Sequence, residues 1–373
     1  MTVSGSIGKG KTSWHYVIEL GRDMNGKRKQ KRKRGFKTKK EAQKALTEAI
    51  HAMNNGSYVE PTKMLMSEYL EDWLENKQIH VKKSTYQKYY WLVNSHIKPF
   101  IGYISLSKLT GLHIQQLYRS LATEKKLSNE NIRNVHKVLN NALKQAVKLE
   151  LIPKNVASVV EPPKATKNEI KVWDVHEVQQ FLKVTQSNRY HIVYLIALTT
   201  GMRQGEILGL RWQDVDFDRE VLHVRQTLSH DGIELNSHTK TAAGTRTIAL
   251  PEQVLHALKT HKIIQAKEKL KTGELYENFD LIVSTSVGTP LHPRNLLRNF
   301  YSQIEKANLN KIRFHDLRHT HATLLLKKGV HPKIVSERLG HADTRITMDT
   351  YSHLLPNMQR DTAKEFGKML FGT

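Results

Sequence analysis

Five residues in the C-terminal half of the chain carry the side chains that phosphate chemistry needs. They are Arg203, His315, Arg318, His341 and Tyr351. A guanidinium holds phosphate oxygens in a planar fork, and a tyrosine hydroxyl is one of the few groups that can attack phosphorus and hold it covalently. Together these residue types predict a site for a negatively charged phosphate.

The spacing of these residues suggests how they are held. His315 and Arg318 lie three positions apart on a predicted helix, so both side chains point to one face. Arg203 and Glu206 repeat this spacing at the start of another helix, where Glu206 is expected to support the guanidinium rather than touch a substrate. Either pair alone is weak evidence, because the first is common by chance and the second is most simply a salt bridge. The occurrence of both pairs in one chain strengthens the prediction of a phosphate site.

The elements that position these side chains are expected in a domain covering residues 170–373. Pro162 and Pro163 indicate that residues 161–169 form a linker before it. The continuous apolar run of residues 190–200 predicts a buried helix. The other elements are expected as strands at 221–228 and 245–250 and as helices near 252–270, 293–307, 315–328, 332–339 and 343–353.

Residues 64–160 are expected to be nearly all helical, because apolar residues recur at helical spacing in four segments. Ser84, Thr110 and Ser128 are expected to begin the second, third and fourth helices. The apolar positions are most simply core. The lysines between them, such as Lys82, could reach a DNA backbone, but so could most surface lysines.

Residues 1–60 predict a small sheet with one helix. Residues 14–20 alternate as a strand does, the turn pair Asn25 and Gly26 follows, and a basic segment supplies the return strand before Thr38 starts the helix. The high density of basic residues in this segment favours contact with phosphate over a face that is only solvated. Its candidate DNA-binding residues are Lys27, Arg28, Lys29, Lys31, Arg32, Lys33 and Arg34. The predicted fold class is therefore multidomain and mainly α with small β-sheets (α+β).

Composition limits the classes of partner. The chain has 373 residues, and 59 Lys and Arg against 35 Asp and Glu give a net charge of +24, which points to nucleic acid or an anionic membrane. No membrane partner is expected, since the strongest basic run is predicted as a strand rather than an amphipathic helix. The chain has no cysteine, which excludes thiolate nucleophiles and cysteine zinc sites. With no signal peptide or membrane span evident, a cytoplasmic, nucleoid-associated protein is expected.

At this point the sequence resembles the tyrosine recombinase (lambda-integrase-like) family of phage and conjugative-transposon integrases. The middle of the chain resembles that family's core-DNA-binding domain, and the first 60 residues resemble its arm-site-binding domains. The stretches that carry the resemblance are 200–212, 239–241 with 246–250, 315–320, 339–341 and 351–353, in the same order and spacing.

The resemblance implies a role for each matching residue. Arg203 and Arg318 would clamp the scissile phosphate, and Tyr351 would be the nucleophile. The resemblance also matches His315 and His341 to the family's two histidines and Lys240 to the lysine of its mobile β-hairpin.

A mechanism follows from these roles. Fixed cations stabilise the charge that builds on the phosphate oxygens. Tyr351, with an ordinary pKa near 10, needs a base, for which His315 is the candidate, and Lys240 would protonate the leaving 5′-oxygen. The product is a 3′-phosphotyrosine, which a 5′-hydroxyl from a second duplex can reseal. No metal, ATP or other cofactor is expected, because one bond forms as another breaks.

The implied protein integrates, and would also excise, a phage or mobile element. Its partners would be double-stranded DNA at core and arm attachment sites, with an excisionase and a DNA-bending host protein as further candidates. Four protomers are expected on two duplexes, because two strand exchanges on two duplexes need four nucleophiles. Residues after about 356 are expected to dock on a neighbouring protomer, as the resemblance implies.

Three alternatives stay open at the level of sequence. One of them, an anionic-membrane or RNA-binding protein, would explain the net charge but not the set of arginine, histidine and tyrosine residues. A type IB topoisomerase-like relaxing enzyme would use the same residues, although it would not need the separate basic N-terminal unit. A DNA-binding regulator with a vestigial site would fit better if Arg203, Arg318 or Tyr351 were missing. A metal cluster is not expected from the nearby histidines, because His315, His319 and His321 do not all share one helix face and no carboxylate completes a site, so His319 is interpreted as structural or supporting.

Overall fold

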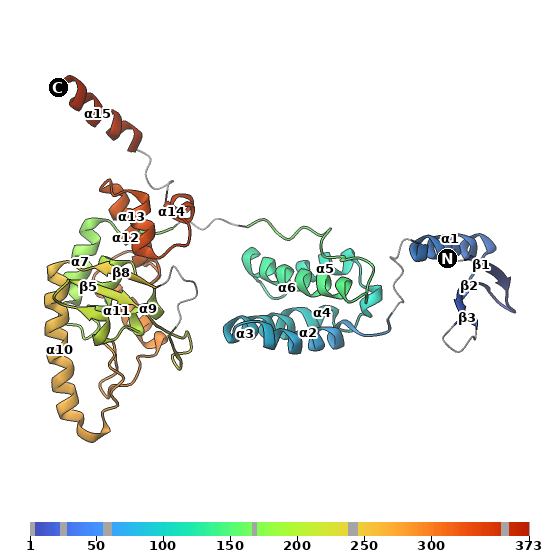
Figure 1. Cartoon of the computed structure of the whole chain (residues 1–373), viewed down its shortest axis with the longest axis horizontal. Helices are drawn as coiled ribbons and strands as arrows, with labels where there is room; N and C mark the ends of the chain where they lie inside the picture. Colours follow the sequence, from blue (N-terminus) through green and yellow to red (C-terminus); the bar gives the residue numbers. More distant parts are fainter. Residues whose placement is uncertain are drawn as a thin grey trace. The chain divides into compact units, whose positions relative to one another are not determined.

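The computed structural model describes residues 4–22, 28–54, 62–165, 170–237, 245–351 and 358–372 (Figure 1). The chain divides into two compact units, Met1–Asn168 and Glu169–Thr373. The division falls inside the linker predicted at 161–169. The fold is mainly helical with small antiparallel sheets, which confirms the predicted class.

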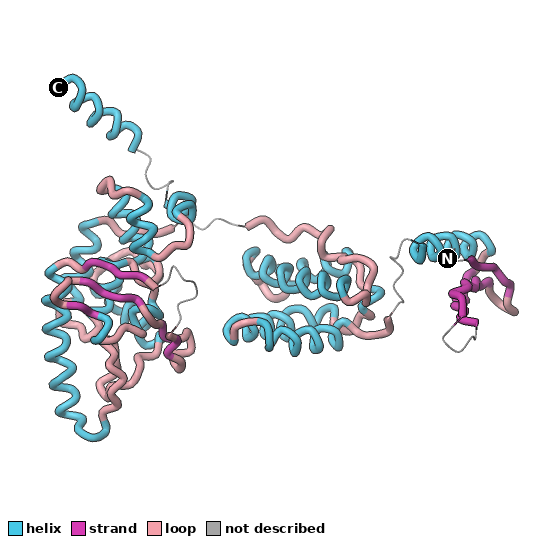
Figure 2. The backbone as a smooth tube through the Cα atoms, in the orientation of Figure 1, coloured by secondary structure: helices cyan, strands magenta, loops and turns pink. Residues whose placement is uncertain are grey.

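The first unit opens with a three-stranded antiparallel sheet packed on one helix (Figure 2). Tyr16 and Ile18 lie on one face of β2 because side chains alternate along a strand, and they pack against Leu46 and Ala49 of α1. The predicted turn at 25–26 lies outside the described residues. The elements are β1 (Ser4–Lys9), β2 (Trp14–Arg22), β3 (Arg28–Phe36) and α1 (Lys39–Asn54).

The rest of this unit is a helical bundle with its own core. Thr110 and Ser128 cap their helices, as predicted. The cap expected at Ser84 lies two residues earlier, at Lys82, so this helix begins at Lys83. Tyr69 ties the bundle together, because its hydroxyl donates to the buried Ala142 carbonyl at 2.6 Å. The bundle contains α2 (Met66–His80), α3 (Lys83–Leu92), a π-helical turn (Val93–Ile97), α4 (Lys98–Ile101), α5 (Gly111–Thr123) and α6 (Asn129–Lys148).

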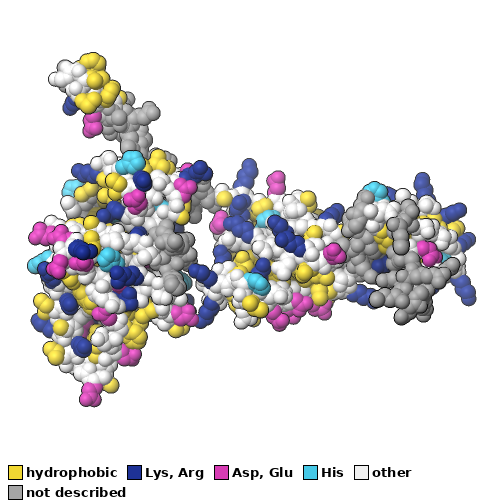
Figure 3. Space-filling view, viewed as in Figure 1, with side chains coloured by type: hydrophobic (Ala, Val, Ile, Leu, Met, Phe, Trp, Pro, Cys, Tyr) yellow, Lys and Arg dark blue, Asp and Glu magenta, His cyan; other side chains and the backbone are white. Residues whose placement is uncertain are grey.

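Charge is unevenly spread over this bundle. In the view of Figure 3, acidic side chains gather along the edge where α2 lies, and Lys and Arg side chains lie over other parts of the surface. The acidic residues of α2 are Glu68, Glu71, Asp72 and Glu75. Like charge repels a phosphate backbone, so this acidic edge of α2 is poorly suited to contact DNA.

The second unit surrounds the buried helix that the apolar run predicts. Aromatic rings of Trp173, Phe181, Tyr194 and Phe300 form the centre of its core. The helices before the sheets are α7 (Val175–Thr185), α8 (His191–Thr200) and α9 (Gln204–Leu208). Those after them are α10 (Glu252–Thr272), α11 (Pro293–Lys306), α12 (Asp316–Lys327), α13 (Pro332–Leu339), α14 (Thr344–Tyr351) and α15 (Met358–Phe371).

Two small antiparallel sheets lie beside these helices. One has the order β4-β5-β8 and the other pairs β6 with β7. The single strand predicted at 221–228 is wrong, because the chain changes sheets within it, and Gln226 between the two pieces donates to the Gly209 carbonyl at 2.7 Å. The strands are β4 (Val215–Asp216), β5 (Val221–Val224), β6 (Thr227–Leu228), β7 (Leu235–Asn236) and β8 (Arg246–Ala249).

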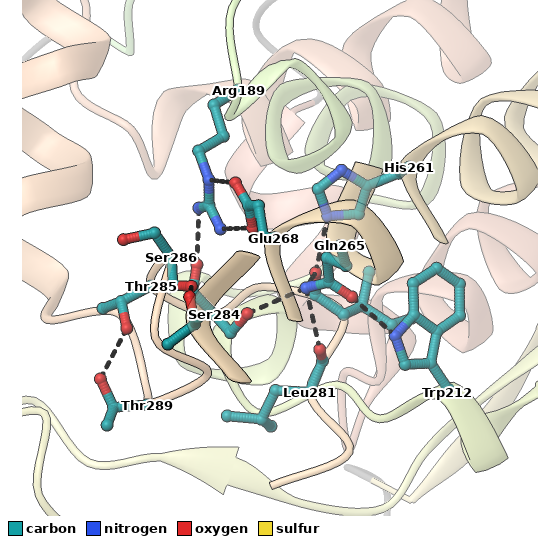
Figure 4. A network of polar contacts seen from close by, with 12 residues as sticks. Arg189, Trp212, His261, Gln265, Glu268, Leu281, Ser284, Thr285, Ser286 and Thr289 are labelled. Carbon is teal, nitrogen blue, oxygen red and sulfur yellow. Dashed lines mark hydrogen bonds and ion pairs between the residues drawn. The ribbon is translucent and has the colours of Figure 1, made fainter. Parts of the chain in front are cut away.

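A polar network fixes the long helix α10 to this unit (Figure 4). Arg189 makes a bidentate pair with Glu268 at 2.7 Å and donates to the Ser284 carbonyl at 2.6 Å. One turn away, Gln265 donates to the Ile282 carbonyl and accepts a hydrogen bond from the Trp212 indole. Because each of these buried or half-buried polar groups has a partner, the network positions the helix rather than forming a site. In the described part of the chain, no helix is long and apolar enough to span a bilayer.

Candidate active site

The first arginine of the site follows a tight turn at the end of α8. Gly201 ends that helix with a φ of +66°, and a Cβ there would lie 2.6 Å from Leu339 and 2.7 Å from His321. A glycine is therefore needed both for the conformation and for the close approach of α12 and α13. The turn delivers Arg203 to the N-terminus of α9.

Glu206 fixes the position of Arg203 through two hydrogen bonds. One of its oxygens accepts from the Arg203 guanidinium at 2.8 Å and the other from the Arg203 backbone N–H at 2.9 Å. The same carboxylate accepts from Arg246 of β8 at 2.9 Å. Burial alone would raise the pKa of Glu206, but the hydrogen bonds and charges of Arg246 and Arg203 outweigh it, so the pKa is lowered. A buried, ionised carboxylate thus joins two arginines.

Arg318 is fixed by two carbonyl oxygens from distant segments. Its two terminal nitrogens donate to Gly201 and to Leu339, each at 2.7 Å. The residue is 3% exposed, and burial, then repulsion from Arg203, lowers its pKa to about 9. That value still leaves the guanidinium charged at neutral pH, so a fixed positive charge lies beside Arg203.

Tyr351 is the last residue of α14 and is almost completely buried, with 1% of its surface exposed. Its hydroxyl lies 2.8 Å from Nδ1 of His319. Burial raises the pKa of Tyr351 to about 12, and the charge of Arg318 counteracts part of that rise. The hydroxyl is therefore protonated at neutral pH and needs a base to become a nucleophile.

The histidines of α12 and of its N-cap, His315, separate into two groups. His315 and His319 lie one turn apart with their rings 5.0 Å apart and edge to face, on the same face as Arg318. His321 points away and binds the Leu198 carbonyl at 2.9 Å. Within the described ranges, no group of three potential metal ligands is present.

His341 follows Gly340, which ends α13 with a φ of +67°. Its Nδ1 lies 2.8 Å from the Thr347 hydroxyl on α14. Burial, then the charges of Arg318 and Arg203, lowers the pKa of His341 to about 4. The ring is therefore neutral at physiological pH and can offer a neutral N–H to an anion.

The structure brings most of the predicted site residues together. The charge of Arg203 acts to lower the pKa values of Arg318 and His341, and the charge of Arg318 acts to lower those of His341 and Tyr351. Lys240 lies outside the described residues.

Two contacts were missed at the sequence level. His319, interpreted as structural, contacts the Tyr351 hydroxyl, and Arg246 binds Glu206. The i, i+4 spacing from His315 to His319 was a usable signal for the first. No local pattern marks Arg246 as a partner of Glu206.

The basic segment of β3 divides between the two faces of its sheet. Lys31 pairs with Ile18 and Lys33 with Tyr16, so both are on the face that α1 covers. Arg32 pairs with Val17 and Arg34 with His15, so both are on the opposite face. Lys27 lies outside the described residues, as do the side chains of Arg28 and Lys29.

Models of known protein families match three stretches of the chain. The model of the Phage integrase family matches residues 171–358, that of an Arm DNA-binding domain residues 6–53, and that of the phage integrase N-terminal SAM-like domain residues 65–122. The chain belongs to the phage integrase family. It is a site-specific DNA recombinase of the tyrosine type, and neither a relaxing topoisomerase nor a non-catalytic regulator is favoured.

Individual relatives support this family assignment along most of the chain. The chain is 29% identical over 379 residues to a Tyrosine recombinase XerC-like protein of Caldanaerobacter subterraneus subsp. tengcongensis, covering 96% of each. It is 29% identical over 347 residues to an Integrase of Streptomyces ambofaciens, covering 91% of this chain and 88% of the relative. The fold is similar to that of the Tn1549 transposon integrase in complex with a circular intermediate DNA, with a TM-score of 0.69, 20% identity and coverage of 81% and 99%.

Proposed function

We propose that Tyr351 attacks a scissile phosphate in DNA and that the chain thereby integrates, and also excises, a phage or mobile element. The observation that carries this proposal is the position of the buried Tyr351 hydroxyl, which is bonded to His319 and lies within the electrostatic influence of Arg318. A tyrosine held in this way is poised for covalent chemistry rather than for packing alone.

Arg203, Arg318 and His341 would stabilise the phosphate. The two carbonyl bonds fix the Arg318 guanidinium, and Glu206 fixes that of Arg203. Because these groups are held before DNA arrives, the charge that builds on the non-bridging oxygens meets donors that need little rearrangement. His341 would add a neutral N–H, since its Nδ1 is engaged with Thr347.

Proton transfer would complete the reaction. Lys240, on the chain between β7 and β8, would give a proton to the leaving 5′-oxygen. A histidine of α12 would take the proton of Tyr351, with His315 the candidate from sequence. The phosphotyrosine conserves the energy of the broken bond, so a 5′-hydroxyl from a second duplex reseals the strand.

The remaining units would place the DNA. The domain arrangement we propose is an arm-binding domain at 1–60, a core-binding domain at 64–160, a linker at 161–169 and a catalytic domain at 170–373. Four protomers would act on two duplexes of the bacterial host, since each of four cut strands needs its own nucleophile. An excisionase and a DNA-bending host protein remain candidate partners for the choice between integration and excision.

A nicked suicide duplex tests the nucleophile directly. The DNA flanking the gene's own locus supplies the core site, and the nick lets the cut fragment diffuse away so that the covalent adduct accumulates. Wild-type protein should form the adduct, and Tyr351→Phe should form none. Tyr301→Phe, a second tyrosine of the same unit that lies over Lys311, should behave as wild type. Undiminished adduct in Tyr351→Phe would refute the proposal.

A further inference from the structure

We propose that His319, rather than His315, is the base that takes the proton of the Tyr351 hydroxyl during strand cleavage and returns it during rejoining. This inference rests on the proposed role of Tyr351 as the nucleophile. The inference gives a catalytic role to His319, to which the family resemblance assigns none.

The contact between the two side chains is direct. His319 Nδ1 lies 2.8 Å from the Tyr351 hydroxyl, within the distance at which a general base must stand from the proton it removes. The rings lie 5.6 Å apart at an angle of 61°. Because Tyr351 is 1% exposed, its hydroxyl has little access to bulk water, and a protein group beside it must accept the proton.

The resting protonation states make Tyr351 the donor and His319 the acceptor of this hydrogen bond. Burial raises the pKa of Tyr351 to about 12, so its hydroxyl carries a hydrogen and donates it. Burial also lowers the pKa of His319, so its imidazole is neutral at physiological pH and has one nitrogen free to accept. The hydrogen bond then requires the tautomer with Nδ1 bare and Nε2 protonated.

His315 is placed differently. Its ring meets His319 edge to face at 5.0 Å, and in the described part of the chain its side chain has no hydrogen bond to Tyr351. Neighbouring protein atoms, then the charges of His319 and Arg318, lower its pKa, although the residue is open to solvent. An open, neutral imidazole beside two arginines is suited to donate to the DNA phosphate, which leaves the buried proton to His319.

The proposed step balances in protons and electrons. The Tyr351 oxygen forms a bond to phosphorus as its proton moves to Nδ1 of His319, which becomes an imidazolium. The bond between phosphorus and the 5′-oxygen breaks, and that oxygen takes its proton from Lys240. Rejoining runs the same steps in reverse, so His319 gives its proton back as the tyrosine leaves.

The charges around His319 shape its response to pH. Arg313, His315, Asp316 and Arg318 face it from α12 and the preceding turn, and Tyr351 faces it from α14. His341, after α13, is also within electrostatic reach. Asp316 raises the pKa of His319 and the two arginines lower it, after the larger effect of burial. Protonation at acidic pH would remove the acceptor, so cleavage should slow as pH falls.

Two DNA substrates distinguish a defect in the base that deprotonates Tyr351 from a defect in the acid that protonates the leaving group. One is a suicide duplex with oxygen at the scissile 5′ position, and the other carries sulfur there. A thiol has a pKa near 8.5 and leaves without a proton, so the sulfur substrate no longer needs Lys240 but still needs a base at Tyr351. His319→Asn suits this comparison, because the amide oxygen can accept a hydrogen bond near the Nδ1 position but cannot hold a proton at neutral pH.

We expect His319→Asn to slow adduct formation by about 100-fold or more on both substrates in single-turnover reactions. Lys240→Ala should be slow on the oxygen substrate and restored on the sulfur substrate. In wild type the cleavage rate on the sulfur substrate should fall as the pH is lowered. In His319→Asn this decrease at low pH should be absent. Melting temperature and DNA affinity should match wild type, which excludes misfolding.

Other results would overturn the inference. If His319→Asn cleaves within about threefold of wild type while His315→Asn is slow on both substrates, His315 is the base. If sulfur restores His319→Asn, the histidine serves the leaving group instead. Adduct formation by Tyr351→Phe would overturn the proposed function itself, whereas an inactive Tyr351→Phe beside a normal His319→Asn would sink this inference alone.

Discussion

Arg318 shows how one side chain can organise a site at the scale of a residue. Its guanidinium bridges the carbonyls of Gly201 and Leu339, so it joins the turn before Arg203 to the turn before His341 while keeping its charge near Tyr351. A planar fork can bind two carbonyls at fixed directions, whereas an ammonium acts as a point charge. The geometry therefore depends on arginine and not on positive charge alone.

Arg318→Lys should slow covalent adduct formation by about 100-fold or more, because the lysine would lose the fork and leave one carbonyl without its donor. Single-turnover cleavage of a suicide duplex measures the effect. Arg313→Lys is the matched control, since that side chain is 67% exposed and pairs with Asp316. Equal rates for Arg318→Lys and wild type would contradict the role given to the fork.

Residue types and spacing are enough to propose candidate site residues but not to arrange them. Arg203, Arg318 and Tyr351 could be chosen from the sequence because their side chains suit phosphate chemistry. That His319 meets Tyr351 could not, because the contact depends on where α14 lies against α12, and those segments are 32 residues apart in sequence. Helical spacing places His319 on the same face as His315 and Arg318, but its contact with Tyr351 depends on how α14 packs against α12.

At the scale of elements, β8 connects several parts of the site. Arg246 begins this strand, pairs with Glu206 of α9 and donates to the Arg338 carbonyl of α13 at 2.7 Å. In sequence, the strand follows the segment that carries Lys240. Glu206 is 4% exposed and serves both arginines, which makes it the central link.

Glu206→Gln should lower the free energy of unfolding by about 3 kcal/mol, because it leaves the buried Arg246 without its counter-charge, and it should also slow cleavage. Thermal melting and the adduct assay measure the two effects. Acid should act in the same direction: the pKa of Glu206 is lowered from 4.5, so its contribution to stability is present above that pH and is lost as pH falls below it.

A surface ion pair provides the control for Glu206. Asp216 and Arg219 lie 3.9 Å apart, and the Arg219 side chain is 85% exposed. Such a pair contributes at most about 1 kcal/mol, so Asp216→Asn should melt close to wild type. A Glu206→Gln variant as stable and active as Asp216→Asn would show that the link is not needed.

The N-terminal sheet gives a second prediction at this scale. Replacing Arg32 and Arg34 with alanine should weaken arm-site binding by at least about tenfold and reduce its salt dependence by about two ions. Replacing Lys31 and Lys33 removes the same charge from the opposite face and should have a much smaller effect. Titrations at several salt concentrations measure both. Equal losses would indicate a general effect of charge rather than a binding face.

Periodicity predicted the elements better than their pairing. The helices of the bundle follow from apolar spacing and from the caps at Thr110 and Ser128. The region 221–228 alternates like one strand, yet it becomes β5 and β6 in different sheets. Alternation reports which side chains are buried, and it does not show which neighbour each part of a strand will pair with.

At the scale of the whole molecule, α15 bears on assembly. Four large apolar side chains of this helix are more than half exposed in a single chain: Phe366, Met369, Leu370 and Phe371. An exposed apolar helix is costly in water unless it finds a partner. This supports the expectation that residues after about 356 dock on a neighbouring protomer.

Removing residues 358–373 should therefore weaken the assembly of four protomers on a four-way DNA junction while leaving binding to one core site near normal. Sedimentation of the protein–DNA complexes measures the stoichiometry. Replacing Phe366 and Phe371 with serine should produce the same defect in the full chain. Complexes of unchanged size would refute docking through this helix.

In the mechanism we propose, the molecule stores the energy of a broken DNA strand on one tyrosine. Mass spectrometry of peptides from the adduct trapped on a suicide duplex tests it most directly, because it identifies the residue that carries the DNA. We expect a nucleotide remnant attached through a phosphate to the peptide containing Tyr351. A remnant on any other residue, or cleavage that leaves the protein unmodified, would contradict it.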